Sequence, residues 1–302
     1  MQRNVKLKDF TSFKIGGNAD IYITPSSCGQ LQAALRFIET EKLPAVLLGG
    51  GTNMLISDTG IRGAVIHTHL MNTLRLRTAD GEPAVEAECG TSMQALVDFC
   101  ARHGLSGLED FAGLPGTVGG AVFMNARCYE KSISDVLYSA SVLTFDNTGY
   151  TLESRTYNKT EWGYKRSPFQ PADKAHAVLG IGRNIIVSAV FKLTAGNKTH
   201  IRRRMEERIR DRTEKGHFKL PSAGSTFKNN HAFGKPSGKL IDEAGLRGFQ
   251  IGGAQVAPWH GNFIVNTGSA TAAEVKELIS TVQKRVKQCT GFELEPEVIF
   301  AG

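Results

Sequence analysis

The sequence predicts an α+β protein with two domains. Segments rich in β-branched residues with apolar–polar alternation occur along the whole chain, and between them apolar residues recur at helical spacing. The length supports two domains, because 302 residues is about twice the usual domain length. Hydrophobic residues make up 41% of the chain and charged residues 22%, so a sizeable core can form.

The N-terminal part begins with a β-α-β pattern. Residues 20–25 (DIYITP) are predicted as a strand, and Ser26 or Ser27 offers an N-cap for the following helix. The apolar residues of that helix recur at helical spacing: Leu31, Ala34, Leu35 and Ile38. Pro44 ends the helix, and AVLLGGG (45–51) is predicted as a short buried strand that runs into three glycines.

More strands and one helix are predicted before residue 195. Thr91 or Ser92 caps the helix, and Gly104 ends it. Strand patterns cover residues 64–70, 83–90 and 184–193, together with two strands joined at Asp146–Gly149.

An arginine-rich helix is predicted at HIRRRMEERIRDR (200–212), with Ile201, Met205 and Ile209 on one stripe. Its six arginines are compatible with a polyanion partner. We favour a solvated helix with i,i+4 ion pairs such as Glu206–Arg210. A domain boundary is predicted near Leu193–Thr199.

The C-terminal part alternates short elements with one long helix. We expect a short helix that ends at Gly245, and a segment that runs into a strand over 252–266. Thr271 and Glu274 form a capping box for a helix that Gly291 closes. FELEPEVIF (292–300) alternates before its proline, which is typical of a strand.

Composition excludes several classes of protein. The five cysteines are odd in number, widely spaced and without a CxxC motif, which argues against a disulfide framework and a zinc site. The N-terminus shows no secretory signal, and no apolar run approaches the length of a spanning helix. We therefore expect a cytoplasmic protein that binds no membrane. The net charge of +7 suits an anionic small ligand as well as it suits nucleic acid.

Two glycine-rich segments are candidate ligand sites. LLGGGTNMLISD (47–58) matches neither a P-loop nor a dinucleotide fingerprint, but its glycines can form an anion-binding nest. A tight turn is the equal alternative. GLPGTVGGAVFMNA (113–126) carries no charge and suits a flat aromatic ligand with a phosphate chain. The alternative there is a loop packed closely on a helix.

Three polar groups are candidate catalytic sites. LPSAGSTFKNN (220–230) places Ser225 in a glycine bend, and a surface turn is its plainer interpretation. WGYKRSPFQ (162–170) places a cationic pair among aromatic residues, either on the surface or in a pocket wall. Glu293, Glu295 and Glu297 would share one face of a strand, unless Pro296 turns Glu297 inward.

These segments, in this order, resemble the UDP-N-acetylenolpyruvoylglucosamine reductases of bacterial cell-wall precursor synthesis. The matching pieces cover nearly the whole chain: FTSFKIGGNAD, LLGGGTNMLISD, GLPGTVGGAVFMNA, GYKRSPFQ, PSAGSTFKNN, GKLIDEAGLRG, GGAQVAPWHGNFIVN and LEPEV. The resemblance implies an FAD-binding region of the vanillyl-alcohol-oxidase-like (PCMH-type) fold over residues 1–195, in subdomains of about 1–70 and 71–195. A smaller α+β substrate domain over 196–302 would follow.

The resemblance also implies ligands and roles. It implies non-covalent FAD, NADPH as reductant, and a UDP-sugar whose enolpyruvyl group is reduced. We expect the protein to be a monomer and to bind no nucleic acid. Ser225 would protonate the substrate, Glu297 would assist, and Lys165 or Arg166 would stabilise the enolate. Substrate contacts would come from Tyr164, Lys228, Asn229, Gln255 and Asn262. FAD contacts would come from Gly49, Gly50, Gly51, Thr52, Asn53, Gly113, Pro115, Gly116, Thr117, Gly119, Gly120, Asn125 and Ala126, and no metal is expected.

Three departures or absences qualify the resemblance. The family pattern is Gly-Tyr-Arg-x-Ser, whereas here Lys165 occupies the arginine position and Arg166 follows it. We favour Lys165, because neighbouring residues of a strand face opposite ways. Asn230 stands where the family usually has proline. The six tyrosines all lie at or before Tyr164, so we expect the shorter subtype, without the tyrosine-bearing loop.

Two rival functions remain open from the sequence. One is an FAD oxidase of the same fold, which would share the glycine segments but not Ser225 with Glu297. The other is a basic nucleic-acid-binding protein built around the arginine helix, which would be colourless and would bind in a salt-dependent way.

Overall fold

The computed structural model describes residues 1–146, 149–171, 182 and 184–302. Its α-helices are α1 (Cys28–Thr40), α2 (Met93–His103), α3 (Val118–Phe123), α5 (Lys198–Glu214), α6 (Ser237–Glu243) and α7 (Ala272–Thr290). Its longer strands are β1 (Gln2–Lys6), β2 (Asn18–Ile23), β3 (Ala45–Leu48), β5 (Ile61–His67), β6 (Leu74–Ala79), β7 (Glu82–Glu88), β11 (Leu137–Asp146), β12 (Gly149–Thr156), β13 (Asn184–Lys192), β15 (Ser222–Ser225) and β18 (Phe263–Asn266). Its shorter strands are β4 (Met54–Ile56), β8 (Leu105–Ser106), β9 (Arg127–Cys128), β10 (Lys131–Ser132), β14 (Thr194–Ala195), β16 (Gln250–Ile251), β17 (Ala254–Val256) and β19 (Ile299–Ala301).

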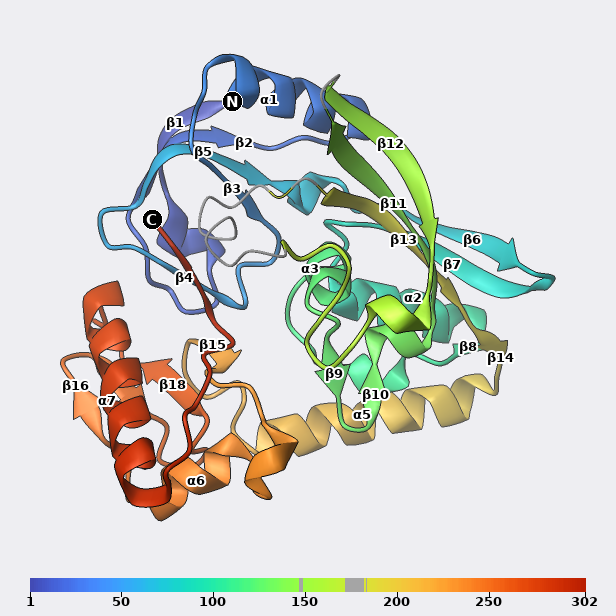
Figure 1. Cartoon of the computed structure of the whole chain (residues 1–302). Helices are drawn as coiled ribbons and strands as arrows, with labels where there is room; N and C mark the ends of the chain where they lie inside the picture. Colours follow the sequence, from blue (N-terminus) through green and yellow to red (C-terminus); the bar gives the residue numbers. More distant parts are fainter. Residues whose placement is uncertain (147–148, 172–181, 183) are drawn as a thin grey trace. The chain divides into compact units, whose positions relative to one another are not determined.

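The strands form three larger sheets, and Figure 1 shows the path of the chain through them. The sheet orders are β1-β2-β5-β3, β12-β11-β13-β7-β6 and β15-β18-β17-β16. The pairs of the second and third sheets are antiparallel, whereas β3 and β5 run parallel. Strands and helices are thus mixed along the chain, which confirms the predicted α+β class.

The chain folds into two compact units. Unit 1 comprises residues 1–2, 21–50 and 63–211, and unit 2 comprises residues 3–20, 51–62 and 212–302. Unit 2 therefore gathers two short segments from the first part of the chain around its C-terminal part. The predicted boundary between residues 195 and 196 separates an FAD-binding region from a substrate domain. These are functional regions, and the boundary stays a prediction.

The core of unit 1 explains the predicted helices. The apolar stripe of α1 is buried as predicted, and the hydroxyl of Ser27 caps α1 by accepting from Gln30 N. In α2, Ser92 rather than Thr91 is the N-cap, and Gly104 ends the helix at φ 68°. Such a left-handed C-terminal position favours glycine.

Helix α5 follows the predicted periodicity only in part. Ile201 and Met205 are buried, but Ile209 is 37% exposed. An i,i+4 ion pair joins Arg203 and Glu207, three residues before the predicted Glu206–Arg210 pair and with the basic residue first. Inward, Arg204 and Arg208 both bind the buried Asp110 carboxylate, each at 2.8 Å. Burial raises the pKa of Asp110, but these two arginines outweigh burial and hold that pKa below its usual range.

The long helix of unit 2 has the predicted capping box. Thr271 accepts from Glu274 N, and the Glu274 carboxylate accepts from Thr271 N. The Asp58 carboxylate, from the loop after β4, accepts from Ala272 N at 2.7 Å and Ala273 N at 3.0 Å. A distant segment and the local capping box together therefore satisfy N–H groups at the start of α7.

The C-terminal strand is shorter than predicted. Residues 293–295 are not in a strand, and regular pairing begins at Ile299, where β19 runs parallel to β4. Pro296 makes an isolated bridge with Phe227 instead. Proline cannot donate to a ladder, so the alternating pattern FELEP does not extend the strand.

Two predicted features fall partly outside the described residues. The turn at Asp146–Gly149 includes residues 147–148, and the segment in which a tyrosine loop would be inserted includes residues 172–181 and 183. Among the helices that the structure describes, none is both long and apolar enough to cross a bilayer.

Candidate functional site

The two glycine segments meet backbone to backbone in unit 1. A Cβ on Gly49 would lie 2.6 Å from Thr117 Oγ1, and one on Gly50 would lie 2.7 Å from the α-carbon of Gly116. Only glycine permits this approach. Gly50 thus faces the Gly116 backbone and Gly49 faces the Thr117 hydroxyl. Main-chain N–H groups of such glycine segments can bind the phosphates of a nucleotide.

The second glycine segment is partly helical. A loop packed on a helix was the alternative interpretation of this segment, whereas residues 118–123 themselves form α3, and Thr117 is its N-cap. A Cβ on Gly119 would lie 2.9 Å from Cys89 Cβ, so this glycine serves close packing. Gly113 N donates to Gln94 Oε1 at 2.8 Å, whereas Pro115 and Gly120 are exposed. In the predicted ligand segment, Gly119 is thus needed for packing, whereas Pro115 and Gly120 are exposed.

The remaining predicted FAD residues of the first segment belong to unit 2. Gly51 has φ 61°, and a Cβ there would lie 2.2 Å from Phe10 O. The Asn53 side chain donates to Glu297 O at 3.1 Å, and Asn53 O accepts from Ile299 N at 2.9 Å. Asn53 therefore binds the segment that carries the predicted catalytic glutamate.

Ser225 lies in a strand and not in a free bend. It ends β15, where it pairs with Phe263 of β18, and the register shifts between Ser222 and Ser225. Gly224 has φ 72° within this irregularity. The bulge interrupts regular pairing next to Ser225, which leaves that residue half-buried.

A short hydrogen-bonded ladder links Ser225 to Glu297. Thr226 N donates to Asn262 O at 2.8 Å, and Thr226 O accepts from Glu297 N at 2.8 Å. Asn262 Oδ1 accepts from Phe227 N at 2.9 Å, while its Nδ2 donates to Phe227 O at 2.8 Å. Asn262 is only 4% exposed. Its amide thus acts as a piece of backbone that holds the residues after Ser225.

The other predicted substrate residues of unit 2 have mixed placements. Lys228 Nζ binds Glu295 Oε1 at 3.0 Å, and Asn229 Oδ1 accepts from Ser237 N at 2.9 Å. Gln255 donates to Gly248 O at 3.2 Å on the neighbouring strand edge. The structure brings Lys228 and Asn229 together with Ser225 and Glu297.

The cationic pair lies in a tight turn of unit 1. We expected a strand, but Gly163 and Arg166 exchange two backbone hydrogen bonds of 3.1 Å, and Lys165 has φ 54°. The argument that favoured Lys165 assumed that residues 165 and 166 lie in a strand, and this assumption is wrong. A Cβ on Gly163 would lie 3.5 Å from Arg166 Nε, so the Arg166 side chain folds back over Gly163. Tyr164 is 39% exposed at the turn.

A buried histidine cluster beside Gly49 was not predicted. His67 ends β5 and is hydrogen-bonded through Nδ1 to the Tyr22 hydroxyl. The rings of His67 and His69 lie 4.1 Å apart. Burial, and then the nearby His69, lower the pKa of His67 to about 4, against a smaller opposing effect of a hydrogen bond with the Gly49 backbone. The two histidines in AVIHTHL (64–70) were the feature of the sequence that could have indicated this cluster.

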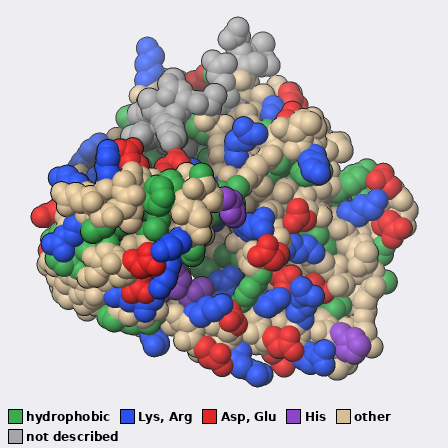
Figure 2. All heavy atoms as spheres, turned by 60° about the horizontal axis from the view of Figure 1, so that its bottom comes forward, with side chains coloured by type: hydrophobic (Ala, Val, Ile, Leu, Met, Phe, Trp, Pro, Cys, Tyr) green, Lys and Arg blue, Asp and Glu red, His purple; other side chains and the backbone are tan. Residues whose placement is uncertain are grey.

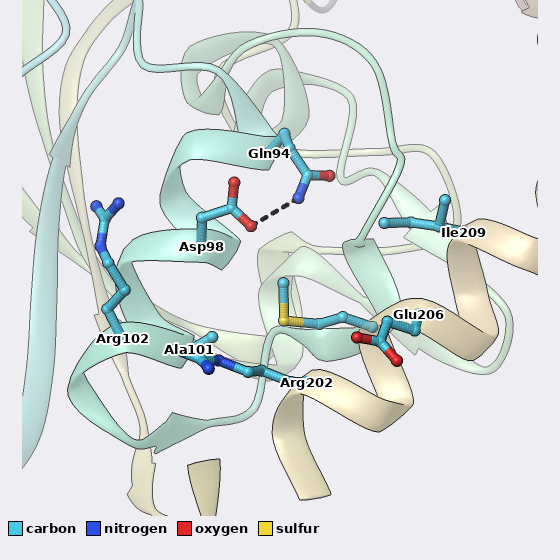
Figure 3. Close-up of a pocket in the computed structure, with 8 residues that line it drawn as sticks. Gln94, Asp98, Ala101, Arg102, Arg202, Glu206 and Ile209 are labelled. Carbon is cyan, nitrogen blue, oxygen red and sulfur yellow. Dashed lines mark hydrogen bonds between the residues drawn. The ribbon is translucent and has the colours of Figure 1, made fainter. Parts of the chain in front are cut away.

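One cavity lies elsewhere in unit 1. It has a volume of about 350 Å³ and is open to the surface between α2 and α5 (Figure 3). Gln94 and Asp98 are hydrogen-bonded on one side of it. Its lining contains none of the predicted site residues: Gln94, Asp98, Ala101, Arg102, Arg202, Met205, Glu206 and Ile209.

The predicted site residues are divided between the two units. Unit 1 carries Gly49, Gly50, the segment 113–126 and the turn 163–166, and unit 2 carries Gly51–Asn53 with the Ser225 and Glu297 ladder. The face seen in Figure 2 mixes Lys and Arg with Asp and Glu, rather than showing one uniform basic patch.

Two protein-family models match the chain. Residues 19–153 match the FAD binding domain, and residues 216–301 match the C-terminal domain of UDP-N-acetylenolpyruvoylglucosamine reductase. The turn at 163–166 lies between the two matches.

Curated relatives match over nearly the full length. The UDP-N-acetylenolpyruvoylglucosamine reductase of Treponema denticola is 51% identical over 297 residues, covering 98% of this chain and 92% of that protein. The protein of the same name from Treponema pallidum is 45% identical over 333 residues, covering 100% of this chain and 93% of that protein. Among solved structures, UDP-N-acetylenolpyruvylglucosamine reductase from Thermus caldophilus superimposes with a TM-score of 0.77 at 34% identity, covering 99% of this chain and 98% of that one.

Proposed function

The chain belongs to the UDP-N-acetylenolpyruvoylglucosamine reductase family, and from this premise we propose that it reduces the enolpyruvyl group of its UDP-sugar to the lactyl ether of UDP-N-acetylmuramate. This is a step of peptidoglycan precursor synthesis. The observation that carries the proposal is the ladder of unit 2, because it joins the two predicted catalytic segments, Ser225–Phe227 and Pro296–Glu297, by direct hydrogen bonds.

FAD is the proposed resident cofactor. The meeting of Gly49 and Gly50 with Gly116 and Thr117 offers a main-chain surface for its phosphates, with residues 113–126 as the second wall. When bound, FAD would supply the hydride for this reduction, with NADPH as the source of its electrons. We place the FAD-binding region at residues 1–195 and the substrate domain at 196–302. We also propose that the protein works as a cytoplasmic monomer.

Side chains of the protein must stabilise the charge that develops on the substrate carboxylate and must deliver a proton to the substrate. Hydride addition makes the substrate carboxylate enolate-like, and a cation placed where that charge develops lowers the barrier. Lys165 or Arg166 supplies this cation. A proton must then reach the neighbouring carbon, and a donor is needed within hydrogen-bond reach.

Ser225 is the proposed proton donor. It follows a bulge and pairs with Phe263 at the end of β15. A serine hydroxyl is a weak acid, so Glu297, held to the same segment through Thr226 O, assists the transfer. Lys228 and Asn229 hold the diphosphate or the sugar.

Visible absorbance and two half-reactions test this function. The purified protein should be yellow, and NADPH should bleach it without oxygen. The enolpyruvyl substrate should then restore the colour, with one lactyl product formed per flavin, as counted by mass spectrometry. A colourless protein would exclude the flavoenzyme, and reoxidation by oxygen but not by this substrate would favour an oxidase of the same fold.

A further inference from the structure

The end of α3 is held by side chains that follow the cationic turn. Phe123 O accepts from Ser167 Oγ at 2.7 Å and from Gln170 Nε2 at 2.9 Å. Carbonyl groups in the last turn of a helix have no partner within the helix, so these two side chains satisfy one of them. α3 is the helix of the glycine segment that forms the proposed flavin wall.

The same side chains hold the turn itself. Gln170 Nε2 also donates to Lys165 O at 3.1 Å. Asn125, directly after α3, donates from Nδ2 to Gly163 O at 2.8 Å and accepts at Oδ1 from Ser134 N at 3.2 Å. Asn125 is 3% exposed, so its amide is engaged at both ends inside the protein. Two backbone carbonyls of the four-residue turn are thus tied to the end of α3.

The turn needs such support because of its backbone. Lys165 has φ 54°, a left-handed conformation that is unfavourable for a residue other than glycine. A residue keeps this conformation where its surroundings fix it. Gln170 binds the carbonyl of that same residue, so it restrains the strained position directly.

We propose that Gln170, together with Asn125, is a positioning residue that fixes the Gly163–Arg166 turn against α3. It thereby sets where the cation of the turn meets the developing charge of the substrate carboxylate. This inference rests on the proposed function. It also gives Asn125 a role different from the predicted FAD contact.

The size of the effect follows from preorganisation. A donor helps a transition state only if it already stands where the charge will develop. A displacement of about 1 Å can cost about 100-fold in rate. Loss of the Gln170 amide removes the bond to Lys165 O but not the bond from Asn125 to Gly163 O, so a partial displacement is expected.

Stopped-flow of the two half-reactions tests the proposal. Gln170→Ala and Gln170→Glu should leave flavin reduction by NADPH at the wild-type rate and slow reoxidation by the enolpyruvyl substrate by about 10- to 100-fold. Gln32→Ala is the matched control, because it removes a comparable bond, from Gln32 Nε2 to Tyr150 O at 3.2 Å, elsewhere in unit 1. The control should not slow reoxidation, and wild-type reoxidation in both Gln170 variants would overturn the proposal.

A double-mutant cycle identifies the cation through which Gln170 acts. In the background of that cation replaced by alanine, Lys165→Ala or Arg166→Ala, the Gln170→Ala change should slow reoxidation no further. In the other background it should keep its full effect. Full additivity in both backgrounds would show that Gln170 does not act through the turn.

A binding measurement separates positioning from general damage. Calorimetry of the oxidised enzyme with the enolpyruvyl substrate should show weaker binding in Gln170→Ala, whereas binding of UDP, which lacks the carboxylate, should be unchanged. Equal losses for both ligands would indicate structural damage and contradict the proposal. If wild-type enzyme itself is not reoxidised by the substrate, the proposed function fails, and that result is distinct from failure of the Gln170 inference.

Discussion

Ser225, the proposed proton donor, follows a backbone irregularity. The register of β15 shifts between Ser222 and Ser225, and Gly224 has φ 72°, before Ser225 pairs with Phe263 of β18. In a continuous ladder its orientation would be set by strand alternation alone. The bulge therefore breaks that alternation directly before Ser225.

Replacing Ser225 separates the two half-reactions. Ser225→Ala should spare flavin reduction by NADPH, because that step delivers no proton to carbon, and should slow reoxidation by about 10²–10⁴-fold. Ser225→Cys should recover part of the rate, since a thiol can also donate. Stopped-flow absorbance measures both steps. Wild-type reoxidation in Ser225→Ala would reduce Ser225 to a structural residue.

His67 gives the protein a predictable acid sensitivity. Its pKa in the folded state is about 4, whereas that of an unfolded histidine is about 6.5. Between these values the unfolded chain binds more protons, so stability is full above about pH 6.5 and falls as the pH drops toward 4. The contribution to the free energy of unfolding should fall by about 2 kcal/mol from pH 7 to pH 5.

Urea unfolding at the two pH values tests this sensitivity. His67→Gln also loses the bond to Tyr22, but that loss is nearly the same at both pH values and cancels in the difference. The variant should therefore lose less stability than the wild type between pH 7 and pH 5. An equal loss in both proteins would show that other groups carry the acid sensitivity.

Among the elements, α7 depends on a carboxylate from a distant part of the chain. Asp58 follows β4 and accepts from two N–H groups at the start of α7, in addition to the local capping box. A negative charge there also interacts favourably with the helix dipole. The helix and the β4 loop therefore stabilise each other within unit 2.

Removal of the Asp58 carboxylate from the start of α7 should lower the stability of the protein without changing its catalytic rate. Asp58→Ala should reduce the free energy of unfolding by about 1–2 kcal/mol, the usual cost of a lost N-cap. Asp9→Ala, which replaces an exposed aspartate of the same unit, is the control. Chemical denaturation with the flavin absorbance as a second probe measures both variants, and equal midpoints would argue against the cap.

For the whole molecule, the cofactor should be held without a covalent bond. The five cysteines all lie in the described part of the chain and form no disulfide there, and we assign no attachment point on them or on a histidine. Acid precipitation should therefore release the yellow colour into the supernatant. Colour that stays with the precipitate would contradict this expectation.

The sequence predicted local features well because their causes are local. The caps at Ser27 and Thr271, the end of α2 at Gly104 and the buried stripe of α1 each depend on residues a few positions apart. Strand patterns likewise located β2, β3 and β13. These features survive in the fold because packing agrees with local preference.

The candidate site residues could be named from the sequence, but their hydrogen bonds could not. The amides of Asn262 and Asn125 were assigned to ligands, yet in the structure both are engaged by backbone groups far away in the chain. The identity of a single asparagine in the sequence does not show which hydrogen-bond partner its side-chain amide will have in the fold. The turn at Gly163–Arg166 was mistaken for a strand, because a non-glycine residue at positive φ is uncommon.

The pairing of β19 with β4 has a consequence for synthesis on the ribosome. Residues 57–298 lie between the two strands, so β4 emerges long before its parallel partner exists. At about 5–20 residues per second, the wait is roughly ten to fifty seconds. During that time β4 lacks the partner that it has in the finished fold, and an unpaired strand edge can associate with other chains. Newly made protein should therefore depend on chaperones more than the folded enzyme's stability alone would suggest.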